Sequence, residues 1–486
     1  MLRKAFFLIL LPSLIWGGSG TFGFYFADST LRIDYYHIGD SKREWITVDA
    51  FYLQSVWAGP KSKLIDQFNN GKYYIKVFDE TKSRLLFSKG FNSYFGEYQT
   101  TAAAKQGTMR TFQESVLIPW PKKTVWVQLL SRDRRNILHP IFEKELIPGK
   151  FAFSKENRAA GTRVIPQHIV GDVHQCVDIA MIAEGYTEED SAKFRKDLQR
   201  FAQILLNKAP FSSYQNKINI YGVFKPSAES HCDEPTHGVY RNTLLNCTFN
   251  SMGSPRYLLT EDNRTLHDVA SAVPYDALMI MVNSPRYGGG GIYNFYMDFT
   301  TDNQWSANVF IHEFGHSFAG LADEYYSSST AYDDFYPPGV EPTEPNITRL
   351  LHAPHVKWQA LVDSGVPIPT PWHKNYYDSL QVAYQKKRAQ FREEIARLQR
   401  EGADQSVIDA KRKESAAWSK KMVNRLKDVL TSEKYFGKVG AFEGAGYISK
   451  GMYRPMLDCV MFQNGDKPFC RVCARRIKEI IQHLSE

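Results

Sequence analysis

The pattern of apolar residues changes once along the chain, and this change restricts the fold more than any other feature. Between residues 21 and 155, short runs such as 47–52, 73–78 and 124–129 alternate apolar with polar side chains. A period of two is typical of half-buried β-strands, and several such strands separated by turn residues indicate a β-sandwich. After a linker at 154–171 that is rich in charge, glycine and proline, strand-like runs alternate with helical ones. A chain of 486 residues is also too long for one core. We therefore expect an N-terminal all-β sandwich over residues 21–155 and an α/β domain over residues 170–486.

The second part of the chain has the pattern of an α/β domain with one separable helical block. A buried strand at 177–183 precedes a helix from Thr187 to about Lys208, and further strands follow at 217–224 and 276–282. A loop of glycines at 288–291 leads into an edge strand near 291–299 and then into another helix. Apolar residues recur at helical spacing between 380 and 398 and again between 407 and 426. This predicts a charged helical hairpin inserted at 376–435, with its basic side chains facing solvent.

The first twenty residues have the features of a signal peptide. Arg3 and Lys4 precede an apolar run at 5–16, and small residues follow at 17–20. The run has about twelve residues, fewer than the roughly twenty that cross a bilayer, so we expect no stable membrane insertion. These features predict an exported protein, periplasmic or extracellular. The net charge of +8 is spread along the chain without a basic motif, which argues against nucleic acid as a partner. The sequence does not indicate an oligomeric state.

Six cysteines are compatible with disulfides in an exported protein. Cys232 with Cys247 and Cys459 with Cys470 each close a short polar loop, so these are the pairings we expect first. The spacing of Cys470 and Cys473 also occurs in zinc knuckles and redox pairs. Because a second such pair and a thioredoxin-like context are both missing, the sequence favours a structural disulfide here.

The segment His-Glu-Phe-Gly-His at 312–316 is the strongest indication of chemistry. Helical residues four apart lie on one face, so His312 and His316 can direct two ring nitrogens at one metal ion. Glu313 is rotated by about 100° from His312 and flanks that ion, where a general base must stand. Zinc lowers the pKa of a bound water to about 7, and a carboxylate can take its proton and later pass it to a leaving amine. The motif therefore predicts one catalytic zinc ion and hydrolysis of a protein or peptide substrate.

A catalytic zinc site needs a third protein ligand and one position for water. Asp323 comes seven residues after His316, which returns it to nearly the same side if the helix persists. If Gly320 ends the helix, the chain can turn back and still deliver Asp323. Glu324 is the neighbouring alternative, and we expect Tyr325 to pack. Asp323 is the favoured third ligand.

Several segments taken together resemble the M64 family of metallopeptidases, the IgA-protease-like group. They are the strand and turn at 177–187, the helix containing 312–316, its continuation at 320–325, and the segments 453–455 and 459–461. The resemblance covers about residues 170–375 and 436–480, and the β-rich front is similar to that family's N-terminal domain. It implies a metzincin-like catalytic domain in which a methionine turn passes beneath the metal. Met461 matches that position best, with Met456 second. It also implies that the edge strand near 291–299 binds a peptide by β-addition.

The sequence departs from the metzincin pattern after the second histidine. That pattern has Gly and then His where this chain has Ala319 and Ala322, and Gly320 and Asp323 each come one residue later. The third ligand therefore stays a choice between Asp323 and Glu324 at this point.

Two further assignments are weaker. Tyr453 or Arg454, just before the Met461 segment, could stabilise an oxyanion or contact substrate, with structural hydrogen bonding as the other interpretation. Asp333 and Asp334 could hold a structural calcium ion, but no EF-hand spacing supports one.

Two other functions fit parts of the sequence. One is a non-catalytic exported protein whose β-domain binds a glycan or protein, which the intact Glu313 argues against. The other is a zinc amidase or exopeptidase acting on small peptides. A closed pocket would favour the amidase, whereas an open groove would favour an endopeptidase.

Overall fold

The computed structural model describes residues 19–254, 257–326, 335–463 and 465–485. The predicted signal peptide, residues 1–20, therefore lies almost wholly outside the described residues, and so do Asp333 and Asp334. In the described part of the chain, no helix is both long and apolar enough to cross a membrane.

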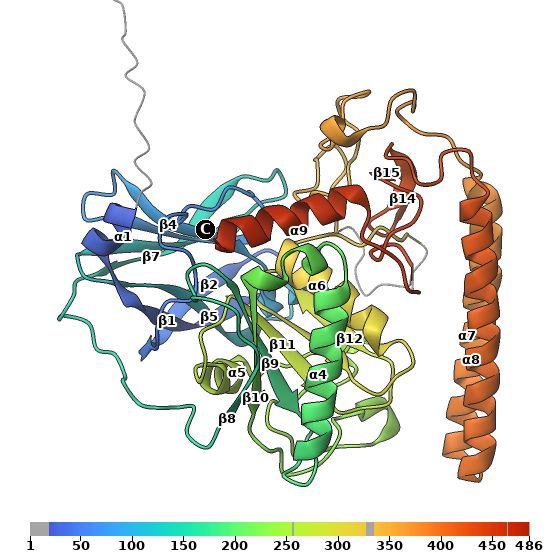
Figure 1. Ribbon diagram of the computed structural model, residues 1–486, viewed down its shortest axis with the longest axis horizontal. Coiled ribbons are helices and arrows are strands. Elements are labelled where there is room, and N and C mark those ends of the chain that lie inside the picture. The colour runs from blue at the N-terminus through green and yellow to red at the C-terminus, as the bar shows by residue number, and fades with distance from the viewer. Residues whose placement is uncertain (1–18, 255–256, 327–334, 464, 486) are drawn as a thin grey trace, which may run out of the picture.

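Antiparallel strands between residues 26 and 146 form two sheets (Figure 1). One has the order β2-β1-β5 and the other the order β4-β3-β6-β7. The strands are β1 Phe26–Gly39, β2 Glu44–Gln54, β3 Tyr73–Asp79, β4 Leu85–Phe91, β5 Arg110–Pro121, β6 Val125–Arg132 and β7 Leu138–Leu146. Short helices that the sequence did not predict also occur here: α1 Ser19–Tyr25, α2 Tyr94–Tyr98 and α3 Ala102–Lys105. Ser93 and Thr101 cap α2 and α3 by accepting hydrogen bonds from backbone N–H groups of the first turn.

The second part of the chain is built on one mixed sheet of order β12-β13-β11-β9-β10-β8. Its inner strands are parallel, and the edge strands β8 and β12 are antiparallel to their neighbours. The strands are β8 Arg163–His168, β9 Val177–Glu184, β10 Ile218–Phe224, β11 Ala277–Val282, β12 Gly289–Ile292 and β13 Tyr296–Thr300. The helices around it are α4 Ser191–Asn207, α5 Asn263–Ala270, α6 Ser306–Ala319 and α9 Arg471–Leu484.

The two faces of this sheet belong to different hydrophobic cores. Ile179 and Met181 of β9 pack with apolar residues of α4, α6 and α9. Ala180 and Ile182 point the other way and pack with α5 and with residues of both N-terminal sheets. Successive side chains of a strand point to opposite faces, so β9 is buried along its whole length. The N-terminal part thus supplies the layer that covers the second face of the mixed sheet.

Two pairs of elements lie outside these layers. The helices α7 Lys374–Arg400 and α8 Gln405–Thr431 run side by side at one edge of the molecule and correspond to the hairpin expected over 376–435 (Figure 1). Tyr384 of α7 stacks on Trp418 of α8, with ring centroids 5.6 Å apart. The strands β14 Phe442–Ala445 and β15 Ile448–Arg454 pair antiparallel and return the chain to α9.

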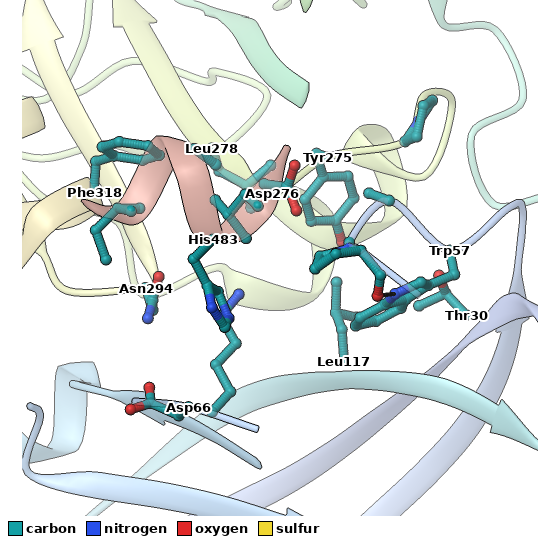
Figure 2. A pocket seen from close by; sticks show the side chains of 18 of the residues that line it. Thr30, Trp57, Asp66, Leu117, Tyr275, Asp276, Leu278, Asn294, Phe318 and His483 are labelled. Carbon is teal, nitrogen blue, oxygen red and sulfur yellow. Dashed lines mark hydrogen bonds between the residues drawn. The ribbon is translucent and has the colours of Figure 1, made fainter. Parts of the chain in front are cut away.

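A cavity of about 90 Å³ lies where the N-terminal part meets the mixed sheet. Trp57 and Leu117 line it from the N-terminal side, and Tyr275, Phe318 and His483 line it from the other side (Figure 2). It is far smaller than the cleft of about 760 Å³ that contains the histidines of α6.

Candidate metal centre

Helix α6 carries both histidines of the motif and ends directly after them. Ala319 is its last residue, and Gly320 adopts the left-handed conformation with φ 58°. The N–H of Gly320 donates to the carbonyl of His316 at 3.0 Å, and the N–H of Leu321 donates to that of Gly315 at 3.2 Å. A glycine in this conformation commonly ends a helix because no Cβ opposes it. The chain therefore turns back toward the histidines after Gly320.

This turn brings Asp323 to the two imidazoles. Asp323 Oδ1 lies 3.0 Å from His312 Nε2 and 3.3 Å from His316 Nε2. The two Nε2 atoms are 3.1 Å apart. Ligand atoms about 2.0 Å from a tetrahedral ion are separated by roughly 3.3 Å, so these three atoms have the spacing of ligands around one ion.

Backbone carbonyls fix which nitrogen of each imidazole carries the proton. His312 Nδ1–H donates to the carbonyl of Val460 at 3.1 Å, and His316 Nδ1–H donates to that of Leu321 at 2.6 Å. A carbonyl only accepts hydrogen bonds, so in the neutral rings both Nε2 atoms carry lone pairs. Those lone pairs face each other, which is repulsive unless a proton or a metal ion lies between them. The donor set therefore fits a bound metal ion.

The Asp323 carboxylate and the two imidazoles each favour the charged form of the other. Burial lowers the pKa of His316, but the Asp323 carboxylate outweighs burial and raises that pKa to about 9. In His312 burial is likewise outweighed by Asp323, and the pKa is raised. Burial raises the pKa of Asp323, but the two imidazoles hold it well below its usual range. The carboxylate is therefore ionised and ready to balance positive charge.

Glu313 lines the same cleft as these three residues but does not belong to their group of converging ligand atoms. Burial, followed by the charge of Glu313, raises the pKa of Asp298 on β13 well above its usual range. The cleft lies between the two parts of the chain, because Asn70, in the loop before β3, and Arg132, at the end of β6, line it from the N-terminal part. The glycines of β12 form part of its wall.

Met461 is fully buried against the underside of α6. A Cβ on Gly315 would lie 2.7 Å from the Met461 Sδ, so the absence of a side chain at Gly315 allows this close packing. The Met461 carbonyl also accepts the N–H of Glu324 at 2.8 Å. Met456, the other candidate, is partly buried at the edge of the same core.

The structure places Tyr447, and not Tyr453, beside the converging ligand atoms of the histidines and Asp323. Tyr453 is not among the described residues that line the cleft, and its backbone pairs with Thr348. The Tyr447 hydroxyl donates to Asp323 Oδ2, and its side chain lines the cleft. Arg454 is fully buried and donates to the carbonyl of Gly444 at 2.6 Å. Sequence reasoning missed Tyr447, because no spacing rule connects it with Asp323.

Glu324 points away from the histidines, toward the C-terminal cysteines. Its Oε1 lies 3.2 Å from the Sγ of Cys473 and 3.7 Å from the Sγ of Cys470. All six cysteines are free in the structure. The expected Cys232–Cys247 and Cys459–Cys470 disulfides are therefore not formed here. At the C-terminal pair the physical reason is that Cys470 belongs to a cluster with Glu324 and Cys473, which a pairing rule based on loop length could not reveal.

Comparison with known families accounts for nearly the whole chain. The family described as IgA Peptidase M64 matches residues 165–481, and the one described as Peptidase M64 N-terminus matches residues 21–143. No curated protein matches the chain. The resemblance to the M64 family that was inferred from the motifs is thereby confirmed. The two matches also confirm a layout of two domains, with mixed α and β content. The chain belongs to the M64 peptidase family, which implies a metallopeptidase acting on proteins or peptides.

Proposed function

We propose that the chain is an exported zinc endopeptidase with His312, His316 and Asp323 as zinc ligands. One arrangement supports this most strongly: two Nε2 lone pairs face each other across 3.1 Å beside a carboxylate oxygen. Two imidazoles and one carboxylate are also a ligand set that leaves the fourth tetrahedral position open, as catalytic zinc sites do.

Glu313 is the general base in this proposal. Zinc bound by the three ligands supplies Lewis-acid chemistry that acidifies water and polarises a carbonyl. Glu313 accepts the proton of the attacking water and delivers it to the leaving amine. The carbonyls of Val460 and Leu321 hold the two imidazoles in one orientation throughout.

The substrate in this proposal is an extended peptide that adds to β12. This strand is one edge of the mixed sheet, and its glycines line the cleft. Backbone without side chains allows a second backbone to approach closely, which β-addition requires. The size of the cleft and its walls from both domains favour a peptide chain over the small substrate of an amidase.

The finer architecture belongs to the same proposal. The packing of Met461 under Gly315 supports a metzincin-like domain with a methionine turn. The two N-terminal antiparallel sheets share one core, which supports a sandwich. Export to the periplasm or beyond rests on the sequence of residues 1–20 alone.

Glu313→Gln tests the mechanism. We expect this variant to keep its zinc, because residue 313 is outside the ligand set, and to lose peptide hydrolysis by about a hundred- to ten-thousandfold. The measurements are metal content by mass spectrometry and cleavage of a peptide library.

Glu97→Gln is the matched control, since Glu97 lines the cleft apart from the metal-binding residues. It should keep most of the activity. Equal activity of wild type and Glu313→Gln would reject Glu313 as the base. A wild-type protein that binds zinc and cleaves no peptide in the library would favour the non-catalytic alternative.

A further inference from the structure

A second group of metal-ligating side chains lies behind the first. Cys459, Cys470, Cys473 and Glu324 are all buried, and their ligand atoms all lie within 4.8 Å of one another. None of them takes part in the function proposed above. They come from three places in the chain: the segment after α6, the segment after β15, and the start of α9.

The distances within this group match those of a tetrahedral zinc site. The Sγ atoms of Cys459 and Cys473 are 3.9 Å apart. Glu324 Oε1 lies 3.2 Å and 3.7 Å from the Sγ atoms of Cys473 and Cys470. Zinc–sulfur bonds of about 2.3 Å and zinc–oxygen bonds of about 2.0 Å give separations of roughly 3.8 Å between sulfurs and 3.5 Å between sulfur and oxygen. The sulfurs of a disulfide are only about 2.05 Å apart.

The local fold directs the thiols at one point. Cys470 is the N-cap of α9, and its Sγ accepts the N–H of Cys473 at 3.4 Å. The N–H of Cys470 in turn donates to the Sγ of Cys459 at 3.2 Å. Helix N-termini and N–H donors of this kind stabilise the thiolate form, which is the form that binds metal.

Glu324 is otherwise poorly satisfied for a buried carboxylate. It is fully buried, and its Oε2 has no hydrogen-bond partner among the residues that the structure describes. Asn346 donates to Oε1 at 3.1 Å, as an outer partner of a metal-binding carboxylate does. The buried guanidinium of Arg454 attracts the Glu324 carboxylate as well. In their deprotonated, metal-binding forms these ligands carry more negative charge than the single Arg454 guanidinium can balance, whereas a divalent cation in addition can balance it.

We propose that Cys459, Cys470, Cys473 and Glu324 bind a structural zinc ion. Four protein ligands close the coordination sphere, so this ion has no open position for a substrate or water and its role is structural. Two ligands of this site are adjacent in sequence to residues of the first centre. Glu324 follows Asp323 directly, and Cys459 precedes Val460, whose carbonyl orients His312. The structural ion would therefore hold in place the segments that position the catalytic ligands.

Zinc content of the full-length protein tests this site separately from the proposed function. We expect about two zinc ions per chain in the wild type and about one in the double variant His312→Ala/His316→Ala. A variant with Cys470→Ser and Cys473→Ser should lose the second ion. Cys176→Ser is the matched control, because Cys176 is a buried cysteine outside the group.

Cobalt substitution reports the ligands directly, even if the cysteine variant does not fold. Co²⁺ bound to the double histidine variant should show the intense near-ultraviolet absorption of thiolate-to-metal charge transfer. The proposal is overturned if the double histidine variant binds neither zinc nor cobalt. It is also overturned if mass spectrometry of the alkylated wild type finds a disulfide among Cys459, Cys470 and Cys473. If the double histidine variant keeps as much zinc as the wild type, with thiolate absorption in its cobalt form, the second site stands and the proposed catalytic site fails.

Discussion

Asp323 illustrates how single residues determine the geometry of the candidate metal centre. Its Oδ1 faces the two imidazoles, and its Oδ2 accepts a hydrogen bond from Tyr447. Tyr447 is held there by its backbone, since its N–H donates to the carbonyl of Tyr325 at 3.0 Å. The tyrosine therefore acts as an outer partner that keeps one carboxylate oxygen directed at the histidines.

Tyr447→Phe should weaken metal binding without changing the fold. The variant removes only the hydroxyl that orients Asp323, and the loss of such an outer partner typically reduces metal affinity about 10- to 100-fold. Competition with a zinc chelator measures the affinity. Tyr453→Phe, outside the cleft, is the control and should bind zinc like the wild type. Indistinguishable affinities for the two variants would remove Tyr447 from the centre.

The sequence could predict part of this geometry. Because four residues make about one helical turn, the approach of His312 to His316 follows from their spacing. Asp323 was expected near the histidines whether or not Gly320 ends the helix, but the sequence left open which of the two routes the chain takes, and the structure has the turn at Gly320. Tyr447 could not be found, because its place depends on the pairing of two distant loop segments. The direction of Glu324 could not be found either, because it depends on cysteines from the far end of the chain.

At the scale of elements, the contact between β12 and α6 forms the wall of the cleft. A Cβ on Gly291 would lie 2.4 Å from the carbonyl oxygen of Glu313 and 3.0 Å from the Cβ of His316. A Cβ on Gly289 would lie 2.6 Å from a methyl group of Val309. The glycines thus allow the strand to lie directly on the helix that carries the histidines.

Gly291→Ala should separate these two elements. The new methyl group meets backbone, which cannot rotate away, so we expect a loss of stability of about 1–3 kcal/mol, as for other overpacked sites. Chemical denaturation measures it. In Gly290→Ala the new Cβ meets mainly the end of the Leu259 side chain, which can move, so this control should lose less. A Gly291→Ala variant as stable as the control would mean that the contact is not tight.

Element boundaries were the least predictable from the sequence. The expected strand near 291–299 is in fact two strands, β12 and β13, joined by a turn in which Asn294 has φ 51°. Glycines carry no apolar pattern, so the run at 288–291 gave no strand signal. The helix expected from Thr187 begins at Ser191. Asp190 is its N-cap position, but the Asp190 carboxylate accepts hydrogen bonds from Thr187 and not from the first turn of the helix.

At the scale of the whole molecule, the two domains are joined by a shared core and by buried charges. Arg32 of β1 is 1% exposed and lies 2.8 Å from Asp34 and 2.7 Å from Asp268 of α5. Arg158 from the linker also pairs with Asp268, at 2.7 Å. The family match and the two-domain layout could be predicted from motifs and periodicity. The shared core could not, because a strand with apolar side chains on both faces does not reveal what covers each face.

Arg32→Met should destabilise the whole protein. Removing the cation leaves Asp34 buried without its main partner, and breaking a buried pair in this way costs about 3–5 kcal/mol. Calorimetric unfolding measures the change. Arg110 and Glu261 also connect the domains, but both are more than two-fifths exposed, so Arg110→Met should cost less than about 1 kcal/mol. Equal losses for the two variants would contradict a role for buried charge in joining the domains.

The most direct test of the central claim is anomalous diffraction at the zinc edge from crystals of the full-length protein. The account predicts a peak between the Nε2 atoms of His312 and His316 and the Oδ1 of Asp323, about 2 Å from each. A map without density at that point, with the two imidazoles directed into separate surroundings, would contradict it.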